Sequence, residues 1–288
     1  MTDQIERLET ASSRLDIDPG NGAVIRSFHI RKEGAWTAAL APSRPSGQPD
    51  PTKSACFVML PWCNRLSAGG VFGANGLHPI APNWPTTPFP VHGIGWLSAW
   101  SVSHRTSKTL SLRLSHDAAD PYAFDASMNF SLHPAGFDLV VKIMNTGDHR
   151  LPFGIGFHPY FPRSPDLRLM FAARHVALFD DRGLPFPMAP VAKELDFSRG
   201  AALGGKALSA LYSDAPTVYI EDATTGFRCR LSSRGCAGTQ IWAPEAEPYF
   251  CVEPVSHLVD DFSYRESSRG HMLSPGGVVK ASLSISSD

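Results

Sequence analysis

Short segments in which apolar and polar residues alternate constrain the fold of this chain most. Leucines alternate with polar residues at positions 110–115, and residues 127–133 and 137–145 repeat the pattern. Pro134-Ala135-Gly136 lies between the last two segments and has the composition of a turn. A period of two puts apolar side chains on one face of a strand, so these segments predict strands with one buried face.

The remaining sequence extends this prediction. Further candidate strands lie at residues 23–30, 36–41, 167–172, 217–221, 227–232, 239–243, 249–255 and 278–285. No segment has a long helical period, and 25 prolines and 24 glycines suit many turns between short strands. We expect a large all-β sandwich in a single domain over residues 21–288, preceded by a polar, loosely attached tail over residues 1–20.

One stretch departs from the alternation. Residues 55–60 are continuously apolar, which indicates a strand buried on both faces or a short core segment. Residues 62–96 then contain five prolines and six glycines without regular periodicity. Long irregular segments in compact domains are usually functional or disordered, and the aromatic content here argues against disorder. We interpret residues 62–96 as packed loop that lines a site.

Charge and cysteine content exclude several classes of function. The formal net charge is −1, from 26 basic and 27 acidic residues without long runs of either sign, so neither nucleic acid nor a membrane surface is an expected partner. No apolar segment has the length needed to span a bilayer, and the charged N-terminus does not resemble a secretory signal. Five cysteines without a C-x-x-C pair predict reduced thiols in a cytoplasmic protein, and no motif requires a metal or an organic cofactor. The oligomeric state stays open.

His158 lies in the sequence Gly154-Ile-Gly-Phe-His-Pro-Tyr-Phe161. The following proline favours an extended backbone at the histidine, and the apolar surroundings allow its pKa to be tuned for proton transfer. The alternative is a buried structural histidine that is hydrogen-bonded to a backbone carbonyl.

Glu253 interrupts the apolar stretch 249–255 and precedes a proline. A carboxylate at the end of such a strand can point into a cleft, whereas simple alternation would place it in water. No nucleophile elbow, phosphate loop or zinc motif accompanies these residues. A carboxylate and a histidine then suggest an acid/base pair. A metal site formed by His92, His158 and His257 is the less favoured alternative.

Other candidates have the chemistry of sugar recognition. Asn64 and Arg65 follow the buried strand and precede two glycines, and His92 lies in a glycine-flanked turn. Arginine, asparagine and histidine can hold hydroxyl groups, although each also has an ordinary structural explanation. The tryptophans at positions 62, 84, 96 and 242 can form a platform for the apolar face of a sugar or simply pack in the core.

The ordered set of motifs resembles the aldose 1-epimerase (galactose mutarotase-like) family. The matching segments are residues 60–66, His92-Gly93 followed by Trp96, residues 157–161, residues 251–257 and residues 273–277. The resemblance runs from about residue 23 to residue 285. It implies a β-supersandwich that interconverts the α and β anomers of a free monosaccharide without a cofactor.

The resemblance also implies roles for individual residues. Glu253 would be the base at the C1 hydroxyl, and His158 would be the acid at the ring oxygen. Sugar hydroxyls would be held by Arg65, His92 and Asn64, with Trp242 as one wall.

One departure from the family leaves alternatives open. An aspartate in a Leu-Asp-x-x-Phe-like stretch usually binds sugar hydroxyls, and residues 206–214 lack that pattern. Asp196 and Asp214 are possible substitutes. The alternatives are a non-catalytic sugar-binding protein on the same fold, or a hexose-phosphate mutarotase that uses Lys53, Arg105 or Arg163.

Overall fold

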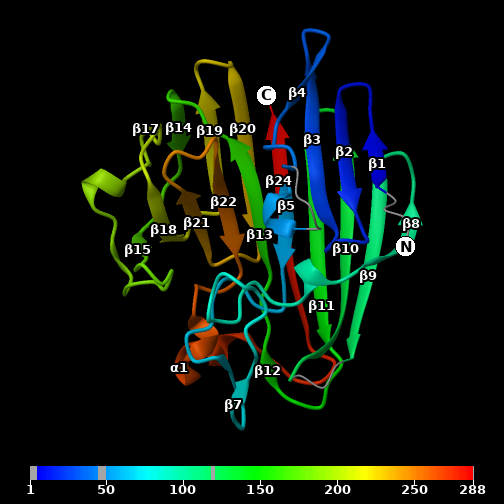
Figure 1. The fold of residues 1–288 in the computed structure, drawn as a ribbon, viewed down its shortest axis with the longest axis vertical. Helices are drawn as coiled ribbons and strands as arrows, with labels where there is room; N and C mark the ends of the chain where they lie inside the picture. The colour runs from blue at the N-terminus through cyan, green and yellow to red at the C-terminus, as the bar shows by residue number, and fades with distance from the viewer. Residues whose placement is uncertain (1–4, 45–49, 118–120, 288) are drawn as a thin grey trace.

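Two large antiparallel sheets make up most of the protein (Figure 1). The computed structural model describes residues 5–44, 50–117 and 121–287. In these residues the α-helical content is a single turn, α1 (Arg265–Ser268), beside 3-10 turns at Pro51–Lys53, Gly95–Leu97, Lys193–Leu195, Asp261–Ser263 and Arg269–His271. The all-β prediction is confirmed. Among the described helices, none is long and apolar enough to cross a membrane.

The first sheet has eleven strands, and the strands of the candidate site lie near its centre. In spatial order they are β1 (Glu6–Glu9), β2 (Ser13–Asp18), β3 (Val24–Lys32), β5 (Cys56–Met59), β13 (Gly156–Pro162), β22 (Tyr249–Val255), β21 (Gly238–Ala243), β18 (Leu208–Ser213), β15 (His175–Leu178) and β16 (Ala189–Pro190), with β4 (Ala35–Ala38) paired to β3.

The second sheet has nine strands and contains the predicted hairpin. Its spatial order is β17 (Ala201–Ala202), β14 (Leu167–Met170), β19 (Thr217–Asp222), β20 (Phe227–Arg234), β24 (Val278–Ser287), β11 (Gly136–Asn145), β10 (Ala123–His133), β9 (Thr109–Asp117) and β8 (Ser101–Arg105). Two small two-stranded sheets complete the described fold. One is the hairpin of β6 (Gly70–Gly73) and β7 (Gly76–Pro79), and the other pairs β12 (Leu151–Pro152) with the distant β23 (Met272–Leu273).

Apolar side chains from both sheets meet in one extended core. Leu110 and Leu112 of β9 are fully buried, as the alternation predicts. Phe28 of β3 packs edge to face on Phe137 of β11, with ring centroids 5.0 Å apart. Because β3 and β11 belong to different sheets, this contact joins the two layers of the sandwich.

The expectation of a loosely attached N-terminal tail is wrong for residues 6–18. These residues form β1 and β2, which extend the first sheet from β3. Leu8, Leu15 and Ile17 are fully buried. These residues alternate with charged residues as in any half-buried strand, but the charged side chains dominate the composition of this segment. Burial of three aliphatic side chains stabilises the pairing by roughly 1.5–3 kcal/mol each.

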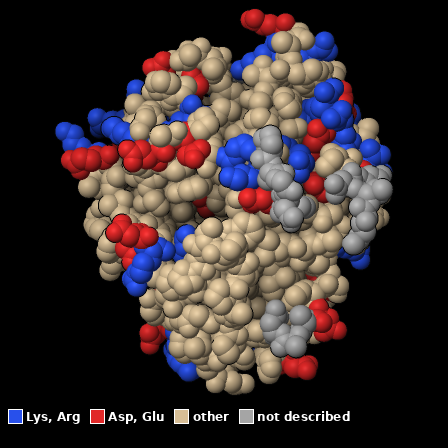
Figure 2. Space-filling model, in the orientation of Figure 1, with Lys and Arg blue, Asp and Glu red and all other residues tan. Residues whose placement is uncertain are grey.

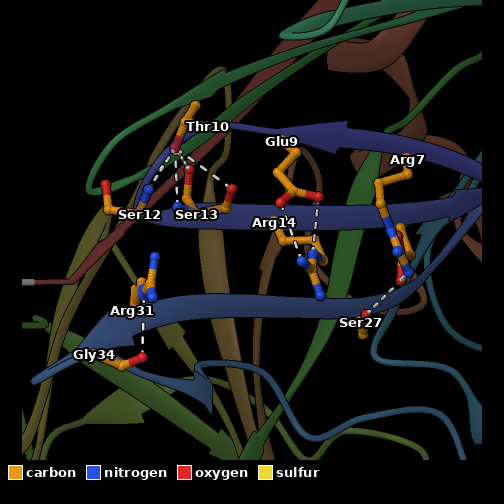
Figure 3. Close-up of polar contacts among 10 residues, drawn as sticks. Arg7, Glu9, Thr10, Ser12, Ser13, Arg14, Ser27, Arg31 and Gly34 are labelled. Carbon is orange, nitrogen blue, oxygen red and sulfur yellow. Dashed lines mark hydrogen bonds and ion pairs between the residues drawn. The ribbon is translucent and has the colours of Figure 1, made fainter.

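Charged pairs occupy the exposed face of the same hairpin (Figure 3). Arg7 donates through Nε to Asp16, at 2.7 Å, and Arg14 donates through Nε to Glu9, at 3.0 Å. In each pair, the two residues lie directly opposite each other in the strand register. Opposite charges on facing positions favour this register by a few tenths of a kcal/mol to about 1 kcal/mol each.

The connection between β5 and β8 is almost free of charge. Arg65 is the one charged residue between positions 60 and 100. The lower centre of the face in Figure 2 is largely uncharged, and this part of the view contains the connection in Figure 1. The prediction of a packed loop is confirmed for most of the segment, although the β6–β7 hairpin gives part of it regular structure.

Candidate active site

The predicted acid/base pair lies on two adjacent central strands. Tyr160 of β13 faces Cys251 of β22 in the antiparallel register, so His158 lies opposite Glu253. The His158 Nε2 atom is 3.4 Å from Glu253 Oε1. Glu253 is only 1% exposed, which excludes the alternative of a strand residue that points to water. Sheet pairing thus fixes the spacing of the two groups.

Both side chains line a cavity of about 450 Å³. This volume lies within the usual range for small-molecule sites. The cavity brings together all the site residues named from the sequence: Asn64, Arg65, His92, His158, Trp242 and Glu253. Gln240, Thr52, Thr86, Thr87 and Ser209 add further polar groups to its wall.

Burial pushes both members of the pair towards their neutral forms. It raises the pKa of the Glu253 carboxyl to about 8, although the nearby Arg65 guanidinium acts in the opposite direction. It lowers the pKa of the His158 imidazole to about 3. At neutral pH the pair therefore holds one proton, on Glu253, and the 3.4 Å contact joins neutral groups instead of an ion pair. Transfer of that proton to His158 would leave the net charge of the site unchanged.

Asn64 organises the neighbouring groups. Its side chain donates to Gln240 Oε1 at 2.9 Å, and its Oδ1 accepts from Arg65 Nη1 at 3.2 Å. Its backbone N–H donates to His92 Nδ1 at 3.3 Å. Burial, together with the proximity of His158 and Arg65, holds the pKa of His92 well below its usual value. A neutral His92 that accepts at Nδ1 carries its hydrogen on Nε2 and is a hydrogen-bond donor there.

The turn that carries His92 requires a glycine. Gly93 has a φ of +76°, and a Cβ at this position would lie 1.9 Å from the Leu60 carbonyl oxygen. The backbone of Gly93 forms a bridge with Leu60, at the end of the buried segment that begins with β5. Close backbone approach, which only glycine allows, thus places the His92 turn beside the central strands.

Aromatic residues form part of the cavity wall. Trp84, Trp96 and Trp242 line the cavity, and the rings of Trp84 and Trp96 lie 4.8 Å apart. Trp62 lies outside it, stacked on Tyr122 at 5.8 Å. Three of the four tryptophans of the predicted platform therefore line the same cavity, and the fourth packs in the core.

His257 has a structural role. Its Nε2 accepts a hydrogen bond from the Cys63 backbone N–H at 3.0 Å, and its Nδ1 lies 2.8 Å from the Leu258 carbonyl oxygen. The ring stacks on Phe262 and is fully buried outside the cavity lining. The alternative metal site formed by His92, His158 and His257 is therefore not assembled. Within the described residues, the grouped metal-type ligands are instead His158, Cys251 and Glu253.

Sequence reasoning missed an acidic turn at the cavity. Asp180 accepts hydrogen bonds from the backbone N–H groups of Arg182 and Leu184, both at 2.9 Å, and so shapes the turn. Asp181 also lines the cavity and is exposed. Gly183 packs on the Arg65 guanidinium, which links the turn to the predicted site.

The two aspartates suggested from the sequence lie elsewhere. Asp214 is within 3.8 Å of Arg174 at an exposed position, and Asp196 accepts a hydrogen bond from the Ser198 backbone at 2.8 Å. Neither lines the cavity. The Asp-Asp-Arg-Gly composition of residues 180–183 indicates a turn, but its relation to the cavity depends on β15, which the sequence analysis did not predict.

Sequence comparisons agree with this architecture. The sequence model of the aldose 1-epimerase family matches residues 19–286. The uncharacterized protein YphB of Escherichia coli K12 is 26% identical over 306 residues, which cover 98% of each chain. The uncharacterized protein YihR of the same organism is 29% identical over 236 residues, which cover 75% of this chain and 76% of YihR.

Solved structures share the fold. An Escherichia coli K12 protein, for which aldose 1-epimerase activity is suggested but not established, has a TM-score of 0.89 at 25% identity, with 99% of both chains covered. A galactose mutarotase-like protein from Clostridium acetobutylicum has a TM-score of 0.84 at 16% identity, with 99% and 98% covered. The fold is thus that of the galactose mutarotase-like sandwiches. The chain belongs to the aldose 1-epimerase family.

Proposed function

We propose that the protein is an aldose 1-epimerase that interconverts the α and β anomers of a free monosaccharide. The observation that carries this proposal is the Glu253–His158 pair, whose facing atoms lie 3.4 Å apart at the wall of a cavity. Anomer exchange removes a proton from the C1 hydroxyl and delivers one to the ring oxygen. A buried pair with one mobile proton matches these requirements.

Ring opening uses the tautomer in which Glu253 is ionised and His158 is protonated. Glu253 takes the C1 hydroxyl proton while His158 protonates the ring oxygen, and the C1–O5 bond breaks to give the open-chain aldehyde. After rotation about C1–C2, His158 takes the proton from the O5 hydroxyl and Glu253 returns one to the aldehyde oxygen. After ring opening Glu253 is protonated and His158 is neutral, which is the tautomer that burial favours. The pair ends the cycle with the proton count with which it began.

The surrounding groups orient the sugar in this proposal. Arg65 has a buried Nε with no protein partner among the described residues, and this donor is available for a hydroxyl. His92 offers its Nε2 hydrogen, and Trp242 forms one wall. The Asn64 amide is occupied by Gln240 and Arg65, so Asn64 acts as a positioning residue.

The hexose-phosphate alternative has less support. Arg163 donates to the backbone carbonyls of Gly204 and Pro244, and Arg105 pairs with Glu6. Neither these arginines nor Lys53 lines the cavity, whereas the two aspartates of the acidic turn do. Arg65 and Arg182 also line the cavity, but Arg182 is paired with Asp180 at 2.8 Å, so the wall has no excess of positive charge for a phosphate dianion. An uncharged sugar is therefore the favoured substrate.

An anomer-exchange assay by polarimetry or NMR, with a panel of free aldoses and hexose 6-phosphates, tests the proposal. We expect faster equilibration of at least one free aldose. The value of kcat/KM should fall above the Glu253 pKa of about 8, because the pair then loses its proton, and below the His158 pKa of about 3, because it gains a second. A folded protein that binds an aldose but accelerates none would instead be the non-catalytic sugar-binding alternative.

Asp181→Asn is expected to raise KM by about tenfold or more and to change kcat by less than about threefold. The substitution weakens a hydrogen bond from a sugar hydroxyl to the carboxylate, and a hydrogen bond to a charged group contributes roughly 1.5–3 kcal/mol. The reason is that Asp181 lines the cavity from the acidic turn, outside the central strands that carry the pair. Asp196→Asn, at an aspartate outside the cavity, is the control. An unchanged KM for every accepted sugar would remove Asp181 from the binding site.

A further inference from the structure

We propose that His158, Cys251 and Glu253 form a binding site for a thiophilic divalent ion such as Zn²⁺ or Cd²⁺. One ligand atom from each of these residues lies within 4.8 Å of the other two. Glu253 and Cys251 are at most 1% exposed and His158 is 6% exposed. The proposal is that an ion bound here replaces the proton of the pair.

Strand geometry brings the thiol to the pair. Cys251 and Glu253 are two residues apart on β22, so their side chains share a face of the sheet. His158 approaches the same face from β13. The arrangement therefore follows from strand pairing instead of from a flexible loop.

The distances suit coordination after small side-chain movements. An ion placed centrally among three atoms that are no more than 4.8 Å apart lies within about 2.8 Å of each, compared with about 2.0–2.3 Å for zinc bonds to nitrogen, oxygen and sulfur. Shifts of about 0.5–0.8 Å in each side chain close this gap. Three protein ligands leave a fourth position, towards the cavity that His158 and Glu253 line.

Charge balance also favours the ion. A divalent ion bound by a thiolate, a carboxylate and a neutral imidazole forms a group without net charge, which suits a buried position. The thiol and the carboxyl each release a proton to solvent as the ion binds. Glu253 Oε1 has no hydrogen-bond partner among the described residues, and Cys251 is not in a disulfide. Both are therefore available as ligands.

The donor set selects among ions. Thiolate and imidazole favour zinc-like ions, whereas Mg²⁺ and Ca²⁺ prefer oxygen ligands. The Arg65 guanidinium acts on Glu253 and would also repel a bound cation. Only an ion that forms a strong bond to the Cys251 sulfur overcomes this repulsion. We therefore expect Zn²⁺ and Cd²⁺ to bind and Mg²⁺ and Ca²⁺ not to bind.

Inhibition is the expected consequence, and this part rests on the proposed epimerase activity. The ion would bind both groups that carry the mobile proton, so neither could act as acid or base. Zinc should lower the rate of anomer exchange, and a chelator should restore it.

Cadmium titration of tag-free protein tests the site independently of catalysis, because the Cd–thiolate bond gives an ultraviolet charge-transfer band. We expect one Cd²⁺ per chain, with loss of this band in Cys251→Ala and in Cys251→Ser, the second of which preserves side-chain size. Cys229→Ala is the matched control, because Cys229 is a buried thiol in the second sheet. Zinc inhibition is then measured for each variant relative to its own rate without metal. We expect it to be at least tenfold weaker in the two Cys251 variants and unchanged in Cys229→Ala.

The outcomes separate the two proposals. An unchanged band in both folded Cys251 variants, or an equal loss of the band in Cys229→Ala, would overturn the metal site. Absence of anomer exchange together with a Cys251-dependent band would refute the epimerase function and leave the site intact. Equal binding of Mg²⁺, measured by calorimetry, would contradict the assignment to thiophilic ions.

Discussion

Glu253→Gln is expected to lower kcat/KM for anomer exchange by about 10²–10⁴, with a larger effect on kcat than on KM. The glutamine side chain preserves the size of the buried carboxyl but can neither accept nor return the C1 hydroxyl proton. The partner His158 stays 3.4 Å from that position on the neighbouring strand. Initial rates of anomer exchange over a range of sugar concentrations measure both constants.

A matched control for this variant is Glu247→Gln. Glu247 is exposed in the turn immediately before β22, so the substitution makes the same chemical change outside the cavity. It should retain wild-type kinetics within about twofold, as expected when no transition-state contact is lost. If Glu253→Gln kept kcat within the same margin while folding normally, Glu253 would not be the base.

The same substitution is expected to stabilise the protein increasingly as the pH rises from 6.5 to 9. Burial raises the folded-state pKa of Glu253 from 4.5 to about 8. Its contribution to stability is therefore fully present below pH 4.5 and is lost as the pH rises through the folded-state value. At 1.36 kcal/mol per pKa unit, the free energy of unfolding of the variant should gain about 2 kcal/mol over the wild type across this pH interval. Urea unfolding at several pH values measures the difference.

The chosen pH interval separates Glu253 from His158. Burial lowers the folded-state pKa of His158 from 6.5 to about 3, so its contribution to stability is lost as the pH falls below 6.5 and is constant above it. The contributions of all other ionisable groups to stability cancel when the variant is compared with the wild type. A difference between the two proteins that does not change with pH would show that Glu253 has an ordinary pKa in the folded protein.

The fold was largely predictable because its signal is local. Leu110 and Leu112 alternate with polar residues and are buried as expected. The N-terminal strands were missed although Leu8, Leu15 and Ile17 follow the same rule. Their charged neighbours form cross-strand pairs, and such pairing is recognisable only once the strand register is known.

The candidate site was predictable where a titratable residue lies among apolar residues. A glutamate within an apolar strand and a histidine before a proline both stand out, and Glu253 and His158 lie together. Asp181 has no such contrast, because an aspartate in a turn is ordinary. Its place at the cavity depends on tertiary contacts between distant segments, including the packing of Gly183 against Arg65. No local pattern encodes such a contact.

The position of the pair on β13 and β22 has a consequence for how this scaffold can diversify. Each of these strands is hydrogen-bonded on both sides, to β5 and to β21, so the spacing between acid and base is held by four adjacent strands. The acidic turn follows β15, near the far edge of the same sheet. Residues of the turn can therefore change during evolution without altering the reacting atoms. In the proposed epimerase, substitutions in the acidic turn would thus change the sugar preference and leave the Glu253–His158 pair in place.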